Sequence, residues 1–289
     1  LAEYGQLYRF ERSGTLHGLF RVRGFCQNDA HIYVQEEEAV DEFVGVMKLH
    51  QYYYQKLNIK SFKVKLGLRD PQNLKKKYHG DEEMWLKAEN MTRLGLEKAG
   101  IPYVEDIGGA VHYGPKGDIV IESVIGKEYA IGTCQIDLYM PQRFNLTYVD
   151  KDGKEKLEVV IHRAPLGSHE RFIGILLDPY AGAFPRWLAP VQTTIIAVTD
   201  RHVDYANKVA QKLKEENIRI EVDDRNTTAS AKIRNAELQK IPYILVVGDK
   251  EIKSKSVNVR VRGEKVLGPM SLNKFTILIT QDIDKKRQV

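Results

Sequence analysis

The sequence predicts an α+β domain built on an antiparallel sheet, followed by an α/β domain. In the first part, strand-like segments with alternating polar and apolar residues are interrupted by two amphipathic helical segments. In the last third, short apolar runs alternate with helical segments, which is typical of a largely parallel sheet covered by helices. The segment 184–190 holds two prolines and separates the two patterns. We therefore expect domains at residues 1–190 and 191–289.

The strands of the first domain are expected to join one antiparallel sheet. They are predicted at residues 7–12, 19–34, 118–124, 128–138 and 157–162. The polar loop 13–18 and the glycine at position 126 have the composition of turns, so each should close a hairpin. These hairpins would place residues that are distant in the sequence on one sheet.

Two helices are predicted to flank this sheet. Residues 40–57 carry apolar side chains at helical spacing, including Phe43 and Met47. Residues 82–98 form a second helix, for which Asp81 is the expected N-cap and Gly100 the expected stop.

The second domain follows a βαβαβ order. Strands are expected at residues 193–199, 218–222 and 243–247, and helices at residues 203–216 and 230–240. Residues 257–262 would add an edge strand, and residues 272–285 a terminal helix.

Composition limits the class of protein. The 289 residues are 43% hydrophobic, enough for packed cores. No apolar run approaches the ~18 residues of a membrane span. Cys26 and Cys134 are too few for a disulfide scaffold, so we expect a globular protein of the reducing cytoplasm. The chain opens at Leu1 inside a strand-like segment, and we expect further sequence upstream.

Charge is distributed unevenly along the chain. The formal net charge is +5, and from Val191 onward 19 Lys and Arg residues face 13 Asp and Glu residues. This excess would attract a polyanion such as a nucleic acid. A solubilising surface would give the same composition, so charge alone leaves both interpretations open.

Arg9, Glu11 and Arg21 form the first candidate site. Arg9 and Glu11 lie two residues apart on a predicted strand and share a face, and Arg21 on the facing strand can lie beside them. A guanidinium makes bidentate contacts with phosphate, and a carboxylate accepts from an exocyclic amine, so this face could hold a nucleoside triphosphate. An exposed cross-strand salt-bridge ladder is the alternative. Spacing alone favours the salt-bridge ladder, because surface ion pairs are common.

A second candidate site lies where two predicted strands end. Alternation places Gln27, Asp29 and His31 on one face, and His162 ends another strand. Two histidines from neighbouring strands could supply two ligands of a zinc site, although a third protein ligand is not evident. Structural histidines are the alternative.

Ser168 and Arg171 form a third candidate. Ser168 can cap a helix that has Arg171 in its first turn. A cation at a helix N-terminus opposes the macrodipole, so Arg171 needs an anionic partner. A nucleotide phosphate or a neighbouring carboxylate would serve.

Taken together, these motifs resemble those of class II aminoacyl-tRNA synthetases, in the form found in the threonyl enzymes. The residues that resemble motif two of that family are Arg9, Phe10, Glu11, the loop 13–18, the run 21–25, and Asp29, Ala30 and His31. The residues that resemble motif three are Ile161, His162, Arg163, Ala164, Gly167, Ser168 and Arg171. The runs 113–116 and 132–135 also match in order and spacing, so the resemblance covers nearly the whole chain.

The resemblance implies a fold and an activity. It implies a class II antiparallel sheet with flanking helices, followed by a five-stranded mixed α/β anticodon-binding domain. It also implies that threonine is activated with ATP and Mg²⁺ and is then transferred to tRNA(Thr). Arg9 would bind the α-phosphate of ATP and the threonine carboxylate, Glu11 would read adenine, and Arg21 and Arg171 would hold the remaining phosphates. Arg9 and Arg171 are thus the expected catalytic residues.

The resemblance also implies a zinc-centred threonine pocket. His31 and His162 would be two of three protein ligands to a zinc ion that binds the substrate amino and hydroxyl groups, with a Cys upstream of this chain as the third. The expected threonine-binding residues are Gln27, Asp29, Tyr113 and Gln135.

In the second domain the resemblance implies that Asn226, Glu251 and Arg260 read the anticodon. Amide, carboxylate and guanidinium groups are suited to the hydrogen-bonding edges of unstacked bases. A homodimer is implied as well, while DNA and membranes are not expected partners.

Two positions depart from the family pattern. Ala130 and Ile131 precede Gly132 where the family has a Gln that touches ATP, and Asn28 replaces a usual Asp at a position expected to point away from the pocket. The chain also lacks motif one and the editing region, so it need not be active alone. Two alternatives stay open: a non-catalytic class II paralogue that binds RNA, or a class II synthetase for serine or proline.

Overall fold

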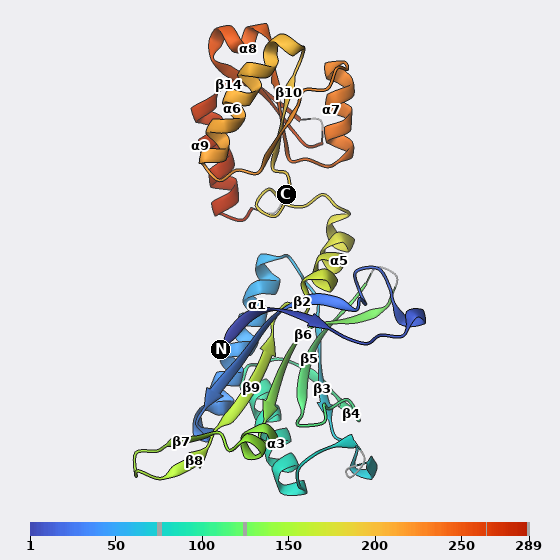
Figure 1. Cartoon of the computed structure of the whole chain (residues 1–289), viewed down its shortest axis with the longest axis vertical. Coiled ribbons are helices and arrows are strands. Elements are labelled where there is room, and N and C mark those ends of the chain that lie inside the picture. The colour runs from blue at the N-terminus through green and yellow to red at the C-terminus, as the bar shows by residue number, and fades with distance from the viewer. Residues whose placement is uncertain (74–76, 124–125, 264, 288–289) are drawn as a thin grey trace. The chain divides into compact units, whose positions relative to one another are not determined.

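The computed structural model describes residues 1–73, 77–123, 126–263 and 265–287, and it divides into two compact units (Figure 1). The first unit is Leu1–Pro179 and the second is Tyr180–Val289. The domain boundary predicted near Pro190 lies inside the second unit and stays a prediction. No helix in the described part of the chain is long and apolar enough to cross a membrane.

The first unit is built on a seven-stranded sheet. In spatial order its strands are β1 (Ala2–Tyr8), β2 (Gly24–Val34), β9 (Val159–Ala164), β6 (Glu128–Asp137), β5 (Lys116–Glu122), β3 (Lys63–Leu68) and β4 (Tyr103–Ile107). Neighbours pair antiparallel except β3 and β4, which are parallel. The hairpin of β7 (Thr147–Val149) and β8 (Glu155–Leu157) is a separate ribbon.

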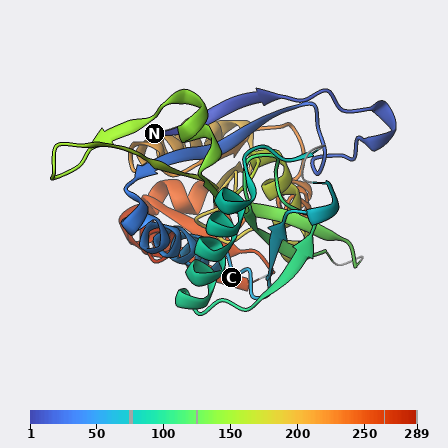
Figure 2. The same cartoon turned by 90° about the horizontal axis from the view of Figure 1, so that it is seen from below.

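Helices α1 (Ala39–Lys56) and α3 (Glu82–Lys98) pack against one face of this sheet (Figure 2). Phe43 and Trp85 are fully buried, as expected for the apolar stripes of amphipathic helices. The Asp81 side chain accepts from the Met84 N–H at 2.8 Å, and Gly100 follows the helix at φ +67°, so both predicted helix signals are confirmed. The pocket described below lies on the opposite face.

Shorter elements complete the first unit. They are α4 (Tyr139–Phe144), α5 (His169–Tyr180) and 3₁₀ turns at Ser13–Thr15, Glu36–Glu38 and Pro71–Asn73. A further 3₁₀ turn, Asp200–His202, belongs to the second unit.

Several predicted strand limits in the first unit are wrong. The strand expected at residues 7–12 lies earlier, because β1 runs from Ala2 to Tyr8. The strand expected at 19–34 is shorter than predicted, because β2 begins at Gly24. A 3₁₀ turn and an isolated bridge between His17 and Arg21 replace the ladder there. The strand expected at 157–162 is split between β8 and β9. Residue 124, the predicted end of another strand, lies outside the described residues.

The second unit holds a five-stranded mixed sheet, as predicted. In spatial order its strands are β11 (Ile220–Asp223), β10 (Thr193–Ala197), β12 (Tyr243–Val247), β13 (Ser256–Val261) and β14 (Lys265–Ser271). The first three are parallel, and β13 and β14 are antiparallel to their neighbours.

Helices cover both faces of this second sheet. α6 (Val203–Glu215) and α9 (Leu272–Asp284) share one buried apolar cluster with the sheet, which includes Val209 and Phe275. α7 (Ala229–Leu238) packs on the other face through Ala236 (Figure 1). A short helix, α8 (Asp249–Ser254), follows β12 and was not predicted.

The prediction that residues 257–262 form the edge strand is wrong. β14 pairs with β13 from Ser256 to Val261, so β13 is interior and β14 is the edge. Gly268 and Pro269 within β14 are residues that normally mark turns, which is why the segment did not read as a strand.

Candidate functional site

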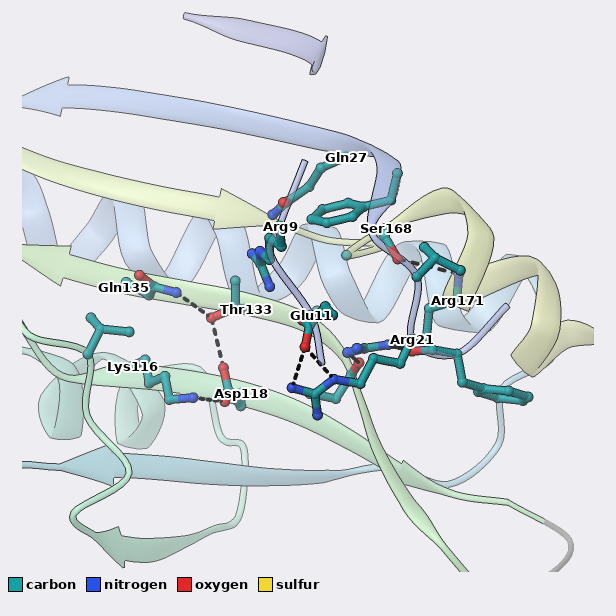
Figure 3. A pocket seen from close by; sticks show the side chains of 17 residues that line it. Arg9, Glu11, Arg21, Gln27, Lys116, Asp118, Thr133, Gln135, Ser168 and Arg171 are labelled. Atoms are coloured by element: carbon teal, nitrogen blue, oxygen red, sulfur yellow. Dashed lines mark hydrogen bonds and ion pairs between the residues drawn. The ribbon is translucent and has the colours of Figure 1, made fainter. Parts of the chain in front are cut away.

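A pocket of about 290 Å³ lies on the face of the first sheet opposite α1 (Figure 3). β6 shows why polar side chains collect there. Cys134 and Ile136 are fully buried on the helix side, so the alternate residues Thr133 and Gln135 must face the pocket. The predicted residues that line the pocket are Arg9, Glu11, Arg21, Gln27, Gln135 and Arg171.

Glu11 and Arg21 form an ion pair at one end of this pocket. The Glu11 carboxylate accepts from Arg21 Nε at 3.0 Å, and the Arg21 Nη2 atom lies 2.9 Å from the same oxygen. The Arg21 side chain is 53% exposed and that of Glu11 16%. The predicted proximity is therefore present, but an irregular segment rather than a strand ladder supplies it. Such an exposed pair is weak and can open for a ligand.

Arg9 is held through its backbone. Its N–H donates to the Arg23 carbonyl at 2.8 Å, and its guanidinium lies over the Phe25 ring at 4.9 Å. The guanidinium therefore stays at the pocket without a carboxylate to neutralise it among the hydrogen bonds and ion pairs of the described chain.

Arg171 adds a third guanidinium. Its backbone N–H donates to Ser168 Oγ at 3.4 Å at the start of α5, where Ser168 was expected as the cap. Its side chain donates to the carbonyl oxygens of Phe20 at 2.9 Å and Ala130 at 3.1 Å, so its partners are carbonyls rather than the carboxylate weighed above. Burial, followed by the nearby charges of Arg9 and Arg21, lowers the pKa of Arg171. An anion entering here would relieve this repulsion.

A chain of polar side chains runs across β5 and β6 along the pocket wall (Figure 3). The Lys116 ammonium pairs with Asp118 Oδ2 at 2.5 Å, and Thr133 Oγ1 donates to Asp118 Oδ1 at 2.9 Å. Gln135 Nε2 donates to Thr133 Oγ1 at 3.0 Å, and the Tyr113 hydroxyl donates to Gln135 Oε1. We call these five residues the polar chain.

The two predicted histidines lie next to each other. His31 on β2 is in register with His162 on β9, and the ring centroids are 4.6 Å apart. Burial and the neighbouring His162 lower the pKa of His31, which favours the neutral imidazole that binds metals. Gln135 is in register with His162 and Lys116 with Gln135, so one row across four strands joins the histidines to the polar chain.

The histidine pair offers two of the side chains that a metal site would need. His162 Nε2 lies 2.9 Å from the buried carboxylate of Asp137, an arrangement typical of metal-ligating histidines. Among the residues that the structure describes, no group of three or more His, Cys, Asp or Glu could hold a metal ion. The two imidazoles fit a zinc site only if a further ligand comes from outside these residues.

The remaining predicted pocket residues lie between the arginines and the histidines. Gln27 forms an isolated bridge with Ser168, and Asp29 is half-buried on the same strand, where its charge acts on His31. Asn28 is only 8% exposed, and its side-chain oxygen accepts from the Leu166 N–H at 3.2 Å. It takes part in packing on the other face, as expected.

In the second unit the three residues expected to read RNA lie on separate elements. Asn226 is exposed in the loop between β11 and α7. The Glu251 carboxylate accepts from the Gly248 N–H at 3.0 Å, and Arg260 lies on β13 with its Nε buried and without a hydrogen-bond partner. No hydrogen bond or ion pair in the described chain joins the three.

Asp118 and Asp137 were missed as site residues. Each lies on a predicted strand at an alternate position to a residue of a matching run: Asp118 two residues after Lys116, and Asp137 two after Gln135. That spacing was the available signal.

The family comparisons agree with this division into two parts. Residues 1–180 match the tRNA synthetase class II core domain (G, H, P, S and T), and residues 192–281 match an anticodon binding domain. Two curated relatives show the extent of the likeness in sequence. A threonine–tRNA ligase of Geobacillus kaustophilus is 46% identical over 99% of this chain and 44% of its own length. One of Thermus thermophilus is 48% identical over 95% of this chain and 41% of its own length.

The structural comparison gives the same family. The crystal structure described as the RNA binding domain of threonyl-tRNA synthetase from Cryptosporidium parvum Iowa II is 33% identical and has a TM-score of 0.88. The match covers 97% of this chain and 69% of that one. A prolyl-tRNA synthetase of Cryptosporidium parvum, at 17% identity and a TM-score of 0.66, shares the fold. This chain spans less than half the length of the curated relatives it matches, and it belongs to the class II tRNA synthetases of the G, H, P, S and T group, with an anticodon binding domain.

Proposed function

We propose that the protein containing this chain is a threonine–tRNA ligase, which activates L-threonine with ATP and transfers it to tRNA(Thr). One observation carries the proposal: a row of side chains across the sheet joins the adjacent imidazoles of His31 and His162 to a pocket that holds three arginines. A site for a hydroxyl-bearing amino acid and a site for polyphosphate would thus be neighbours. The curated relatives named threonine–tRNA ligase support this substrate.

ATP would bind at the arginine end of the pocket. The uncompensated guanidiniums of Arg9 and Arg171 would hold the α-phosphate and the outer phosphates, with Mg²⁺ as the counterion. Binding would open the Glu11–Arg21 pair, which frees the carboxylate to accept from the adenine amine and the guanidinium to bind phosphate. Catalysis would then rest on positioning and charge stabilisation.

The first step forms an acyl adenylate. A threonine carboxylate oxygen attacks the α-phosphorus, and the bond from that phosphorus to the bridging oxygen breaks, which releases pyrophosphate. Arg9, which lines the pocket, would hold both the carboxylate and the α-phosphate, and Arg171 would stabilise charge on the leaving group. A terminal ribose hydroxyl of tRNA(Thr) then attacks the carbonyl carbon and releases AMP.

Threonine would bind at the histidine end of the pocket. His31 and His162 would hold a zinc ion together with a ligand from outside the described residues, and this zinc would supply Lewis-acid binding of the substrate amino and hydroxyl groups. Asp29 would accept a hydrogen bond from the substrate hydroxyl, while Gln27, Tyr113 and Gln135 would line the pocket. A substrate without the hydroxyl would leave buried polar groups unpaired.

The second unit would bind the anticodon of tRNA(Thr) through Asn226, Glu251 and Arg260. Their amide, carboxylate and guanidinium groups suit the hydrogen-bonding edges of unstacked bases. A homodimer is part of the proposal.

A non-catalytic class II paralogue is the second candidate. The observation that favours it is the methyl side chain of Ala130, which lines the pocket where the related enzymes carry a Gln that touches ATP. Ala130 nevertheless contributes its carbonyl oxygen to Arg171, so the position still serves the nucleotide end of the pocket.

ATP/pyrophosphate exchange by the product of the full gene separates these candidates. Threonine, serine, valine and proline would be compared with and without a zinc chelator. Exchange that requires threonine and is abolished by chelation supports the proposed function. Exchange with serine or proline alone assigns another substrate, and binding of tRNA(Thr) without exchange supports the paralogue.

A further inference from the structure

Asp118 is the only carboxylate of the polar chain, and it sets the direction of each hydrogen bond between Asp118 and Tyr113. Asp118 lies on β5 with a side chain that is 17% exposed, and it accepts from Lys116 on its own strand and from Thr133 on β6. Beyond Thr133 the chain continues through Gln135 to Tyr113 (Figure 3 shows the part up to Gln135).

The directions follow from the number of hydrogens each group carries. An ionised carboxylate only accepts, so the single hydroxyl hydrogen of Thr133 must point to Asp118. The Thr133 oxygen must then accept, which places the amide NH₂ of Gln135 toward it. The amide carbonyl of Gln135 is left facing Tyr113, so Tyr113 donates its only hydroxyl hydrogen to that carbonyl.

The consequence appears at the far end of the polar chain. With its hydrogen committed to Gln135, the Tyr113 oxygen can only accept from a ligand. The Tyr113 ring lies against His162, with ring centroids 4.9 Å apart, at the histidine end of the pocket. A hydrogen-bond donor on the bound amino acid would find an acceptor there.

We propose that Asp118 is a positioning residue that fixes the Tyr113 hydroxyl as an acceptor for the amino or hydroxyl group of the amino acid substrate. It does not touch the substrate itself. Its effect travels through Thr133 and Gln135 over three hydrogen bonds, and it also holds Lys116 at the pocket wall. This inference rests on the proposed function, because it assigns a substrate group to the same pocket.

A carboxylate is needed at position 118 because an amide could reverse the polar chain. In Asp118→Asn the new NH₂ can donate to Thr133, whose hydroxyl would then donate to Gln135 after a flip of that amide. The flipped amide would donate to Tyr113, and the tyrosine hydrogen would point into the pocket. The Tyr113 hydroxyl would then present a donor to a donor on the substrate. Both directions of the hydrogen-bond chain would be populated in Asp118→Asn, so only part of the protein would present an acceptor.

Thr133→Val tests the same relay while it keeps the Asp118 carboxylate and its pair with Lys116, although one carboxylate oxygen loses its donor. The valine side chain has nearly the shape of threonine but lacks the hydroxyl, so the chain is cut between Asp118 and Gln135. Thr133→Ser keeps the hydroxyl and is the conservative variant. Asp106→Asn, at an exposed carboxylate on the edge strand β4, is the matched control.

The experiment measures the KM for threonine, the KM for ATP and kcat in ATP/pyrophosphate exchange by the product of the full gene. Asp118→Asn and Thr133→Val should each raise the KM for threonine roughly tenfold, the size expected for one unmade buried hydrogen bond, with the KM for ATP unchanged. Thr133→Ser, which keeps the hydroxyl donor, should restore most of the loss in KM for threonine that Thr133→Val causes, and Asp106→Asn should match the unchanged protein. The variant that combines Asp118→Asn with Thr133→Val should have a KM for threonine no higher than that of Asp118→Asn alone, because both changes interrupt the same hydrogen-bond chain.

The outcomes separate this inference from the proposed function. If the unchanged protein shows no threonine-dependent exchange, the proposed function fails and the inference with it. If it exchanges and Thr133→Val keeps its KM for threonine, the relay is overturned, even if Asp118→Asn is impaired through Lys116. If Asp118→Asn does not fold, as judged by thermal unfolding, Thr133→Val and Thr133→Ser decide the matter.

Discussion

His162 Nε2 lies 2.9 Å from Oδ2 of Asp137, whose side chain is fully buried. The other carboxylate oxygen of Asp137 accepts from the N–H groups of Tyr139 and Met140, each at 2.8 Å. Because this carboxylate can only accept, the proton of a neutral His162 stays on Nε2. The lone pair is then on Nδ1, the nitrogen that would bind a metal together with His31.

The first prediction concerns Asp137. In Asp137→Asn the side-chain oxygen can still accept from the backbone N–H groups, but the NH₂ faces His162. It would donate to Nε2 and so favour the tautomer with the proton on Nδ1, which cannot bind a metal through that nitrogen. Zinc affinity of the full gene product should fall about 10- to 100-fold, measured by competition with a coloured chelator. Unchanged affinity would show that His162 does not bind zinc through Nδ1. The variant's thermal unfolding in chelator serves as the control for folding.

A second prediction concerns the nucleotide end of the pocket. Arg171→Lys keeps a positive charge but loses the planar donors that reach Phe20 and Ala130. We expect ATP affinity to fall roughly tenfold or more while threonine affinity stays the same, as measured by calorimetric titration of each ligand. Equal weakening for both ligands would contradict the placement of Arg171 at the phosphates alone.

A third prediction concerns pH and stability. Burial is the main cause that lowers the pKa of His50 from 6.5 to about 4, and the charge of Arg163 adds to it. In the unfolded chain the His50 imidazole takes up a proton near pH 6.5, but in the folded chain only near pH 4. The neutral imidazole therefore contributes to the stability of the fold above pH 6.5, and this contribution is lost as the pH falls toward 4. The loss is on the order of 3 kcal/mol at full extent.

His50→Gln removes this titration and provides the comparison. Its free energy of unfolding in urea should fall less between pH 7.5 and 4.5 than that of the unchanged protein. Parallel pH profiles for the two proteins would refute the assignment. The variant itself is expected to be less stable at neutral pH, because Nδ1 of His50 lies 2.8 Å from the Val46 carbonyl and the side chain is fully packed.

The fourth prediction concerns RNA. Arg260→Ala removes the buried, unpartnered guanidinium nitrogen from β13 and should weaken binding of an anticodon stem–loop RNA by about 1–3 kcal/mol. ATP/pyrophosphate exchange should not change. Asn207→Ala, on the exposed side of α6, is the control and should bind RNA normally. A loss that is equal for every anticodon sequence would assign Arg260 to phosphate contacts rather than to a base.

The longer helices of this fold could be predicted because their signals are local. Helix α3 has an N-cap in Asp81, a stop in Gly100 and an apolar stripe between them. β3 and β4 were missed because strands that pair through a helical connection carry no turn signal between them. Strand β14 was missed because its glycine and proline favour a turn locally, whereas pairing with β13 overrides that preference.

The candidate site shows the same limit. A predicted hairpin placed Arg21 near Glu11, and the structure brings the two together. His31 and His162 were predicted to lie at the ends of neighbouring strands, and their rings are in contact. The role of Asp118 could not be read from its strand alone. It depends on the register of Asp118 with Thr133, which only the assembled sheet defines. The zinc and anticodon roles came from the family resemblance and stay predictions.

The row of His31, His162, Gln135 and Lys116 crosses four strands, of which only β5 and β6 are neighbours in the sequence. A shift of β6 by one residue would turn Gln135 away and present the apolar side chains of Cys134 and Ile136 instead. The site therefore exists only in correctly paired molecules, and these long-range pairings are the slow part of folding such a topology. Ligand binding should thus recover during refolding at the rate of the last strand pairing. Chains with a shifted register would be compact but would not bind the ligand.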